Sequence, residues 1–321
     1  MLHHSQTGGQ TGRLWNRTGS EQNRKAAKPM IISIHIGAHS TNGAQLMRGL
    51  LKNKAVLADH GVAVPNPSLY RDVLPDVMRK VKSARATPET QEMLLDHMLE
   101  SDDCARLVLS YEDVICLPAF IFDKGRLYTK ASFKLPWLCN VFADHEVEFF
   151  IGLRNPATFI PAAFSQCGPN LTYESFIDTA DLESLRWSDV LTLIRKSCPN
   201  AAVTCFAYED TPLTWAQIMR DIAGIGPMVP ISGGLDILAT IMKREGMKRL
   251  RTYLNTHRPQ NEVQRRRILT AFLDKYVDED ALEEEIDLPG WDEALIERLT
   301  ELYEDDLDLI ETMEGVHFIA P

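Results

Sequence analysis

Residues 31–44 read IISIHIGAHSTNGA, and this stretch decides the fold. Its first six residues are an apolar run bounded by Pro29 and Gly37, which is typical of a buried strand. From Thr41 to His60, apolar residues recur at helical spacing. The sequence therefore predicts a strand, a short glycine-containing loop and a helix, which is the opening unit of an α/β fold.

The same alternation of apolar runs and helical patterns continues along the chain. Further strands are predicted at 62–64, 107–110, 147–153 and 202–208. Helices are predicted at 71–84, 88–101, 133–142 and 188–197, with another beginning at Pro156. Strands that alternate with helices favour a parallel sheet covered by helices on both faces, so the predicted fold class is α/β.

The last third of the chain shows helical patterns at 234–253, 260–276 and 291–313, and no comparable strand. We interpret it as a helical C-terminal extension, about 234–314, of one domain that spans 30–321. Residues 1–29 are polar and basic, without the apolar stretch of a signal peptide, and we predict a disordered N-terminal extension.

The composition limits the class of partner. Hydrophobic residues make up 45% of the chain, enough for a sizeable core. The net charge of −11 argues against a nucleic-acid partner, which usually needs a basic face. No run approaches the ~18 apolar residues of a membrane span. We therefore expect a cytoplasmic protein with neither nucleic acid nor membrane as its partner.

The loop that follows the first strand is the main candidate for a binding site, because ligands of parallel sheets bind beyond the carboxyl ends of the strands. Main-chain N–H groups at a helix start bind oxyanions, helped by the helix dipole. The candidate anion-binding residues are Gly37, Ser40, Thr41, Asn42 and Gly43. The P-loop lysine is absent, so a tight strand-to-helix turn without a ligand is the alternative.

Charged side chains follow the later strands. Arg154 offers a donor fork suited to phosphate, with a surface ion pair as the alternative. Glu112 and Glu209 are candidate general bases, with a cap or ion-pair role as the alternative for each. His35 and His39 are four residues apart, but that spacing shares a face only on a helix, so we predict no metal site.

Two runs of charge lie in the last third. Nine basic residues fall within 243–267, and seventeen acidic residues fall within 278–314. One interpretation is two solvated helix faces that pair within the fold. The other is that the basic run contacts an anionic cofactor or substrate.

Several of these segments together resemble the sulfotransferase family. Its bacterial members often read H-I-G-x-x-K-T-G-T-T-x-L, and residues 35–46, HIGAHSTNGAQL, match that frame without gaps. The family's R-[DN]-P motif resembles residues 153–159, LRNPATF, and its Y-E-D resembles residues 208–210. Residues 303–319 are similar to the C-terminus of a bacterial subgroup, so the resemblance spans roughly residues 31 to 319.

The resemblance implies a P-loop-type α/β fold, similar to P-loop NTPases and sulfotransferases. It also implies 3′-phosphoadenosine-5′-phosphosulfate (PAPS) as the sulfonate donor. Loop 37–44 would hold the phosphosulfate, and Arg154 would hold the 3′-phosphate. Glu112 or His39 would deprotonate the hydroxyl or amine of a small-molecule or glycan acceptor.

The chain departs from the family pattern at the residues that carry charge. The motif lysine falls on Ser40, its threonines fall on Gly43 and Ala44, and the serine that partners Arg154 falls on Ala162. Losing one preorganised donor in such a site costs roughly 100- to 1000-fold in rate. Two hypotheses follow: a PAPS-dependent sulfotransferase with impaired catalysis, or a non-catalytic anion-binding or protein-interaction module on the same fold.

Overall fold

The computed structural model describes residues 29–321 except 102, 178, 283–285 and 287. Apart from Pro29, the predicted N-terminal extension lies outside the described residues. One six-stranded sheet has the order β2-β3-β1-β6-β7-β8, and every neighbouring pair is parallel. Its strands are β1 (Ile31–His35), β2 (Val62–Ala63), β3 (Arg106–Ser110), β6 (Glu146–Leu153), β7 (Ala202–Ala207) and β8 (Val316–Ile319).

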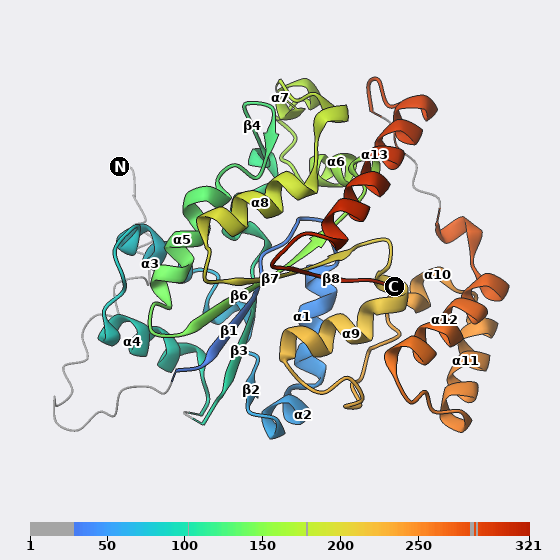
Figure 1. Cartoon of the computed structure of the whole chain (residues 1–321), viewed down its shortest axis with the longest axis horizontal. Helices are drawn as coiled ribbons and strands as arrows, with labels where there is room; N and C mark the ends of the chain where they lie inside the picture. The colour runs from blue at the N-terminus through green and yellow to red at the C-terminus, as the bar shows by residue number, and fades with distance from the viewer. Residues whose placement is uncertain (1–28, 102, 178, 283–285, 287) are drawn as a thin grey trace, which may run out of the picture.

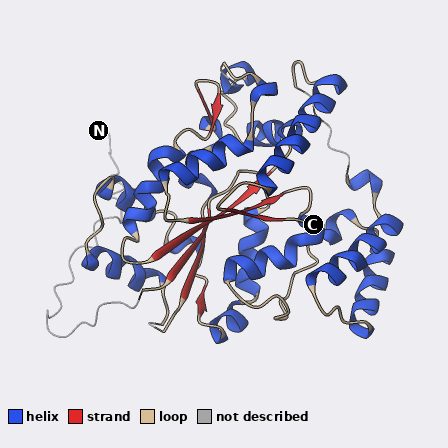
Figure 2. Cartoon of the chain, viewed as in Figure 1, coloured by secondary structure: helices blue, strands red, loops and turns tan. Residues whose placement is uncertain are grey.

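Helices cover both faces of this sheet, which confirms the predicted α/β class (Figures 1 and 2). One face carries α1 (Gly43–Lys52), α2 (Lys54–Asp59) and α9 (Thr211–Ala223). The other face carries α3 (Leu74–Val81), α4 (Pro88–Met98), α5 (Ala131–Val141), α6 (Pro156–Ser165), α7 (Tyr173–Ile177) and α8 (Trp187–Ser197). The central strands are mostly apolar because both of their faces are largely buried.

A small antiparallel hairpin, β4 (Phe122–Asp123) and β5 (Arg126–Leu127), interrupts the alternation between β3 and α5. Its turn residues Lys124 and Gly125 both have positive φ, at 51° and 74°, as a two-residue hairpin loop requires. The hairpin places Tyr128 and Arg126 against the helices of the second face.

The C-terminal third divides into two parts. The helices α10 (Leu238–Ile241), α11 (Arg244–Thr256) and α12 (Glu262–Tyr276) share a hydrophobic cluster of their own. Buried Arg220 of α9 forms an ion pair with Glu262 and ties this unit to the sheet layer. By contrast, α13 (Glu293–Glu311) packs on α6 and α8, and none of the described helices is long and apolar enough to cross a membrane.

The expectation that the last third holds no strand was wrong. β8 is a four-residue edge strand that pairs with β7. It is too short to give a periodic pattern, and its position in the sheet is decided by the pairing with β7. Among the described residues, no ion pair joins the basic run 243–267 to the acidic run 278–314; the ion pairs of these runs are with other carboxylates, as in Arg265–Glu262 and Arg298–Glu183.

Asp306 of α13 is the buried contact that locks the C-terminal part onto α8. Its Oδ2 accepts the N–H groups of Trp187 at 2.6 Å and Ser188 at 3.2 Å, at the first turn of α8. These N–H groups have no acceptor within the helix. A carboxylate from a distant helix therefore acts as the N-terminal cap of α8.

We expect Asp306→Ala to lower the free energy of unfolding by roughly 2–4 kcal/mol, because two buried N–H groups lose their acceptor. Urea-induced unfolding measures the change. Asp306→Asn keeps an acceptor oxygen and should be milder, and Asp305→Ala, at the exposed neighbouring position, should have little effect. Equal destabilisation by Asp305→Ala and Asp306→Ala would contradict the capping role.

Candidate functional site

The carboxyl ends of β1, β3, β6 and β7 meet at one edge of the sheet, and every candidate residue lies there. The loop 36–42 runs between β1 and α1, Glu112 follows β3, Arg154 follows β6 and Glu209 follows β7. Glu112 contacts Gly43, and Arg154 contacts Ser40. The structure therefore brings together the residues that the sequence singled out.

The first half of the loop remains part of the sheet. The Ala38 N–H donates to Gly152 O at 3.0 Å, and the Gly152 N–H donates to Gly37 O at 2.7 Å. Gly37 has a φ of 110°, which a residue with a Cβ rarely adopts. The Ala38 N–H and the Gly37 carbonyl oxygen therefore bond to β6 and do not bind a ligand.

His39 is buried, with 1% of its surface exposed, between a tyrosine and a carboxylate. The Tyr128 hydroxyl accepts the His39 main-chain N–H at 3.2 Å and lies 2.7 Å from Nδ1. His39 Nε2 lies 3.1 Å from Asp113 Oδ1. If the hydroxyl donates to Nδ1, Nε2 carries the proton and donates to Asp113. In this arrangement both ring nitrogens have protein partners.

The hydroxyl of Thr41 also turns inward. It donates to Ala38 O at 2.7 Å, and Thr41 is buried. A Cβ at Gly152 would come within 2.6 Å of that hydroxyl, so the glycine in β6 makes room for it. Ser40 and Asn42 have left-handed backbones, with φ of 58° and 68°, which Asn tolerates.

Glu112 occupies the head of α1. Its Oε1 accepts the Gly43 N–H at 3.1 Å. A Cβ at position 43 would come within 2.2 Å of that same oxygen and 2.9 Å of His35 Cε1. The absence of a side chain at Gly43 therefore makes the space that the carboxylate fills.

Burial raises the pKa of Glu112 above its ordinary value. The electrostatic interaction with His39, the Gly43 N–H and the charge of Arg71 act in the opposite direction but do not cancel the effect of burial. A carboxylate with a raised pKa becomes neutral at a higher pH than an exposed one.

Arg154 lies beside the loop but is engaged by the protein. Nη1 donates to Ser40 O at 2.9 Å, and Nε donates to Thr158 Oγ1 at 2.9 Å. The guanidinium carbon stacks 4.3 Å from the centroid of the Tyr208 ring, and Arg154 is 5% exposed. Arg154 therefore lies near the loop, and its hydrogen bond to Ser40 O holds the main chain of the loop.

Glu209 joins two strand ends to the last helix. It accepts the Asn155 N–H at 2.8 Å and the Tyr303 hydroxyl at 2.9 Å. Asn155 in turn caps α6 through the Ala157 N–H at 2.9 Å. The sequence left a cap role open for Glu209. These contacts provide it, because Glu209 accepts the N–H of Asn155, the residue that caps α6.

Sequence reasoning missed the residues that complete the site from outside the strand ends. They are Tyr128 after the β4–β5 hairpin and Arg71, whose Nη2 donates to Ser110 O at 2.8 Å. The Asp-Lys-Gly turn at 123–125 was a signal for the hairpin. Nothing local in the sequence indicated that Tyr128 would reach His39.

Comparisons with known proteins were made on the whole chain. No protein-family model and no curated protein matches it. Among solved structures, a crystal structure of a sulfotransferase from Alicyclobacillus acidocaldarius aligns with 83% of this chain and 99% of that chain, at a TM-score of 0.35 and 12% identity. A similarity of that size assigns no site or activity, so the function has to be inferred from the contacts.

The residues at the head of α1 do not fit a phosphosulfate group as they are arranged. The N–H groups of Ala38, His39 and Gly43 already have protein acceptors. The Glu112 carboxylate is placed where a second negative charge would have to bind, and Ser40 supplies no cation. Within the described ranges, no group of three or more His, Cys, Asp or Glu side chains is placed to hold a metal ion.

We expect Gly43→Ala to destabilise the protein, although Gly→Ala in a helix usually stabilises it by about 0.5–1 kcal/mol. The added methyl group displaces the Glu112 carboxylate and crowds His35. In a Glu112→Ala background the penalty should shrink by about 1 kcal/mol or more, which a double-mutant cycle in urea measures. In an Asp113→Ala background it should not shrink, and equal coupling in both backgrounds would refute the direct contact.

Proposed function

We propose that this chain is a non-catalytic anion-binding module on an α/β fold, whose anion site at the head of α1 is gated by Glu112. The observation that carries the proposal is the 3.1 Å hydrogen bond from the Gly43 N–H to Glu112 Oε1. It means that the protein's own carboxylate sits where an external anion would bind.

The head of α1 is suited to a negative charge for a general reason. The N–H groups of Gly43, Ala44 and Gln45 belong to the first helical turn and have no acceptor within the helix. The helix dipole adds to their attraction for an anion. Ala44 and Gln45 are exposed, so a ligand that displaces Glu112 can reach this turn.

Sulfonate transfer from PAPS is the rival function, and the same contacts argue against it. Transfer develops negative charge on the leaving phosphate, which preorganised donors must stabilise. Here Ser40 replaces the lysine, the Thr41 hydroxyl is used by Ala38 O, and Glu112 adds a negative charge at the site. The raised pKa of Glu112, caused first by burial, is the one feature that would suit a general base.

The test is calorimetric titration with 3′-phosphoadenosine-5′-phosphate, the desulfonated product of PAPS. We expect weak binding to the wild-type protein and at least about 10-fold tighter binding to Glu112→Gln, because a like charge is removed from the site. Asp113→Asn is the matched control, because it removes a neighbouring charge that contacts His39 and not Gly43. Its affinity should stay within about 3-fold of the wild type.

Two results would overturn the proposal. One is equal affinity for the wild type and Glu112→Gln. The other is sulfonate transfer from PAPS to a phenol by the wild-type protein, lost in Glu112→Gln, which would assign Glu112 as a catalytic base instead.

Binding should also depend on pH. Because burial raises the pKa of Glu112, this side chain becomes neutral at a higher pH than an exposed glutamate. The affinity for inorganic sulfate, which stays a dianion from neutral to mildly acidic pH, should therefore rise as the pH falls through that pKa. In Glu112→Gln the rise should be lost, and an unchanged pH profile would exclude Glu112 as the gate.

A further inference from the structure

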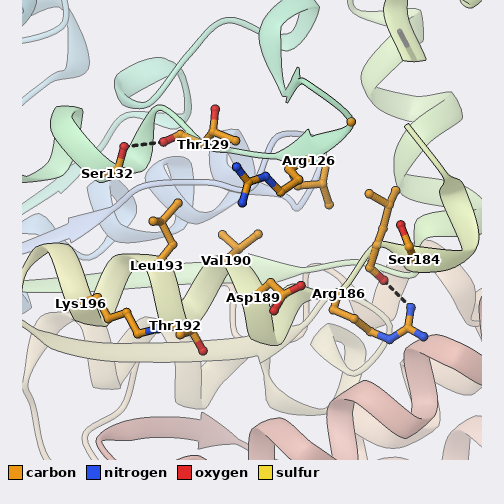
Figure 3. Close-up of a pocket in the computed structure, with 13 residues that line it drawn as sticks. Arg126, Thr129, Ser132, Ser184, Arg186, Asp189, Val190, Thr192, Leu193 and Lys196 are labelled. Carbon is orange, nitrogen blue, oxygen red and sulfur yellow. Dashed lines mark hydrogen bonds between the residues drawn. The ribbon is translucent and has the colours of Figure 1, made fainter. Parts of the chain in front are cut away.

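A cavity of about 400 Å³ lies between the β4–β5 hairpin and α8, away from the head of α1 (Figure 3). Its lining includes three cationic side chains, Arg126, Arg186 and Lys196, against one carboxylate, Asp189. The chain as a whole carries a net charge of −11, but the lining of this cavity has an excess of positive charge. Basic clefts of this kind concentrate anions.

The cationic groups differ in how far the protein already uses them. Arg186 Nη1 donates to the carbonyl oxygens of Glu183 and Leu185, both at 2.8 Å. Arg126 and Lys196 are exposed, and in the part of the chain that the structure describes neither side chain has a hydrogen bond or an ion pair. Arg126 projects from the hairpin over α8, so its guanidinium is available to a ligand (Figure 3).

The remaining lining defines the size and polarity of the ligand. Val190 and Leu193 of α8 face the hairpin and make an apolar wall (Figure 3). The hydroxyls of Thr129, Ser132 and Ser184 also line the cavity, but each donates its proton to an oxygen of the protein. Its volume lies within the range of small-molecule sites. The Arg126 guanidinium next to an apolar wall suits an oxyanion that carries a small apolar body.

We infer that this cavity binds a small phosphomonoester, with the phosphate on Arg126 and the apolar part against Val190 and Leu193. It is a second site, independent of the gated site proposed above. The cavity residues Leu127 and Arg186 are followed by Tyr128 and Trp187, whose buried rings pack with centroids 6.1 Å apart. This aromatic wall separates the cavity from His39 and Arg154.

The probe is phenyl phosphate, titrated into the full chain by calorimetry. Arg126→Gln should weaken binding about 10-fold, because a charge-assisted contact is lost. Asp189→Asn should tighten binding about 3-fold or more, because it removes the opposing charge. Both side chains are exposed, so the variants should fold, and thermal unfolding of each checks this.

Controls separate this site from unspecific attraction and from the head of α1. Lys248→Gln removes an exposed cation from α11, outside the cavity, and should leave the affinity unchanged. Glu112→Gln should leave the part of the binding that is lost in Arg126→Gln unchanged, so failure of the gated site and failure of this one are distinguishable. Inorganic phosphate should bind at least about 10-fold more weakly than phenyl phosphate, because it buries no apolar surface.

Three results would overturn the inference. The first is no binding of phenyl phosphate to the wild type up to millimolar concentrations. The second is equal loss of affinity in Arg126→Gln and Lys248→Gln, which would indicate unspecific charge attraction. The third is equal affinity for phenyl phosphate and inorganic phosphate, which would remove the apolar wall from the site.

Discussion

The Glu112 carboxylate at the first turn of α1 is the contact around which the carboxyl edge of the sheet is arranged. It depends on Gly43, because any side chain there would occupy the same space. A helix N-terminus attracts one negative charge, and a second one nearby is repelled by the first. The protein's own Glu112 carboxylate therefore interacts with the N-terminal end of the α1 dipole. An external anion that binds there has to displace or neutralise that carboxylate. In the anion site that we propose, this contact sets both the affinity and the pH response.

The other polar groups at the edge are hydrogen-bonded to groups of the protein itself. Tyr128 and Asp113 hold His39, Arg154 holds Ser40 O, and the Thr41 hydroxyl holds Ala38 O. A loop with this many internal partners has little freedom to rearrange around a phosphosulfate. The same residue types that would suggest a catalytic centre, namely histidine, arginine and glutamate, here build a rigid support.

The last part of the chain contacts this edge at several points. Tyr303 binds Glu209, Thr300 accepts the Asn155 side-chain amide at 2.8 Å, and Asp306 caps α8. All three contacts come from α13, which packs on the sheet layer while α11 and α12 form a cluster apart. The C-terminal third therefore has two roles: one part stabilises the site, and the other extends the surface.

The sequence by itself determined the layers of the fold, and the tertiary structure decided the chemistry of the edge. Apolar runs identified β1 and β6 because strands buried on both faces are mostly apolar. The contact between Glu112 and Gly43 joins residues 69 positions apart, and the one between Tyr128 and His39 joins residues 89 apart. Periodicity reports whether a residue is buried, not which partner it meets. For that reason the sequence could name the residues of the edge, but only the folded chain shows that they bind one another.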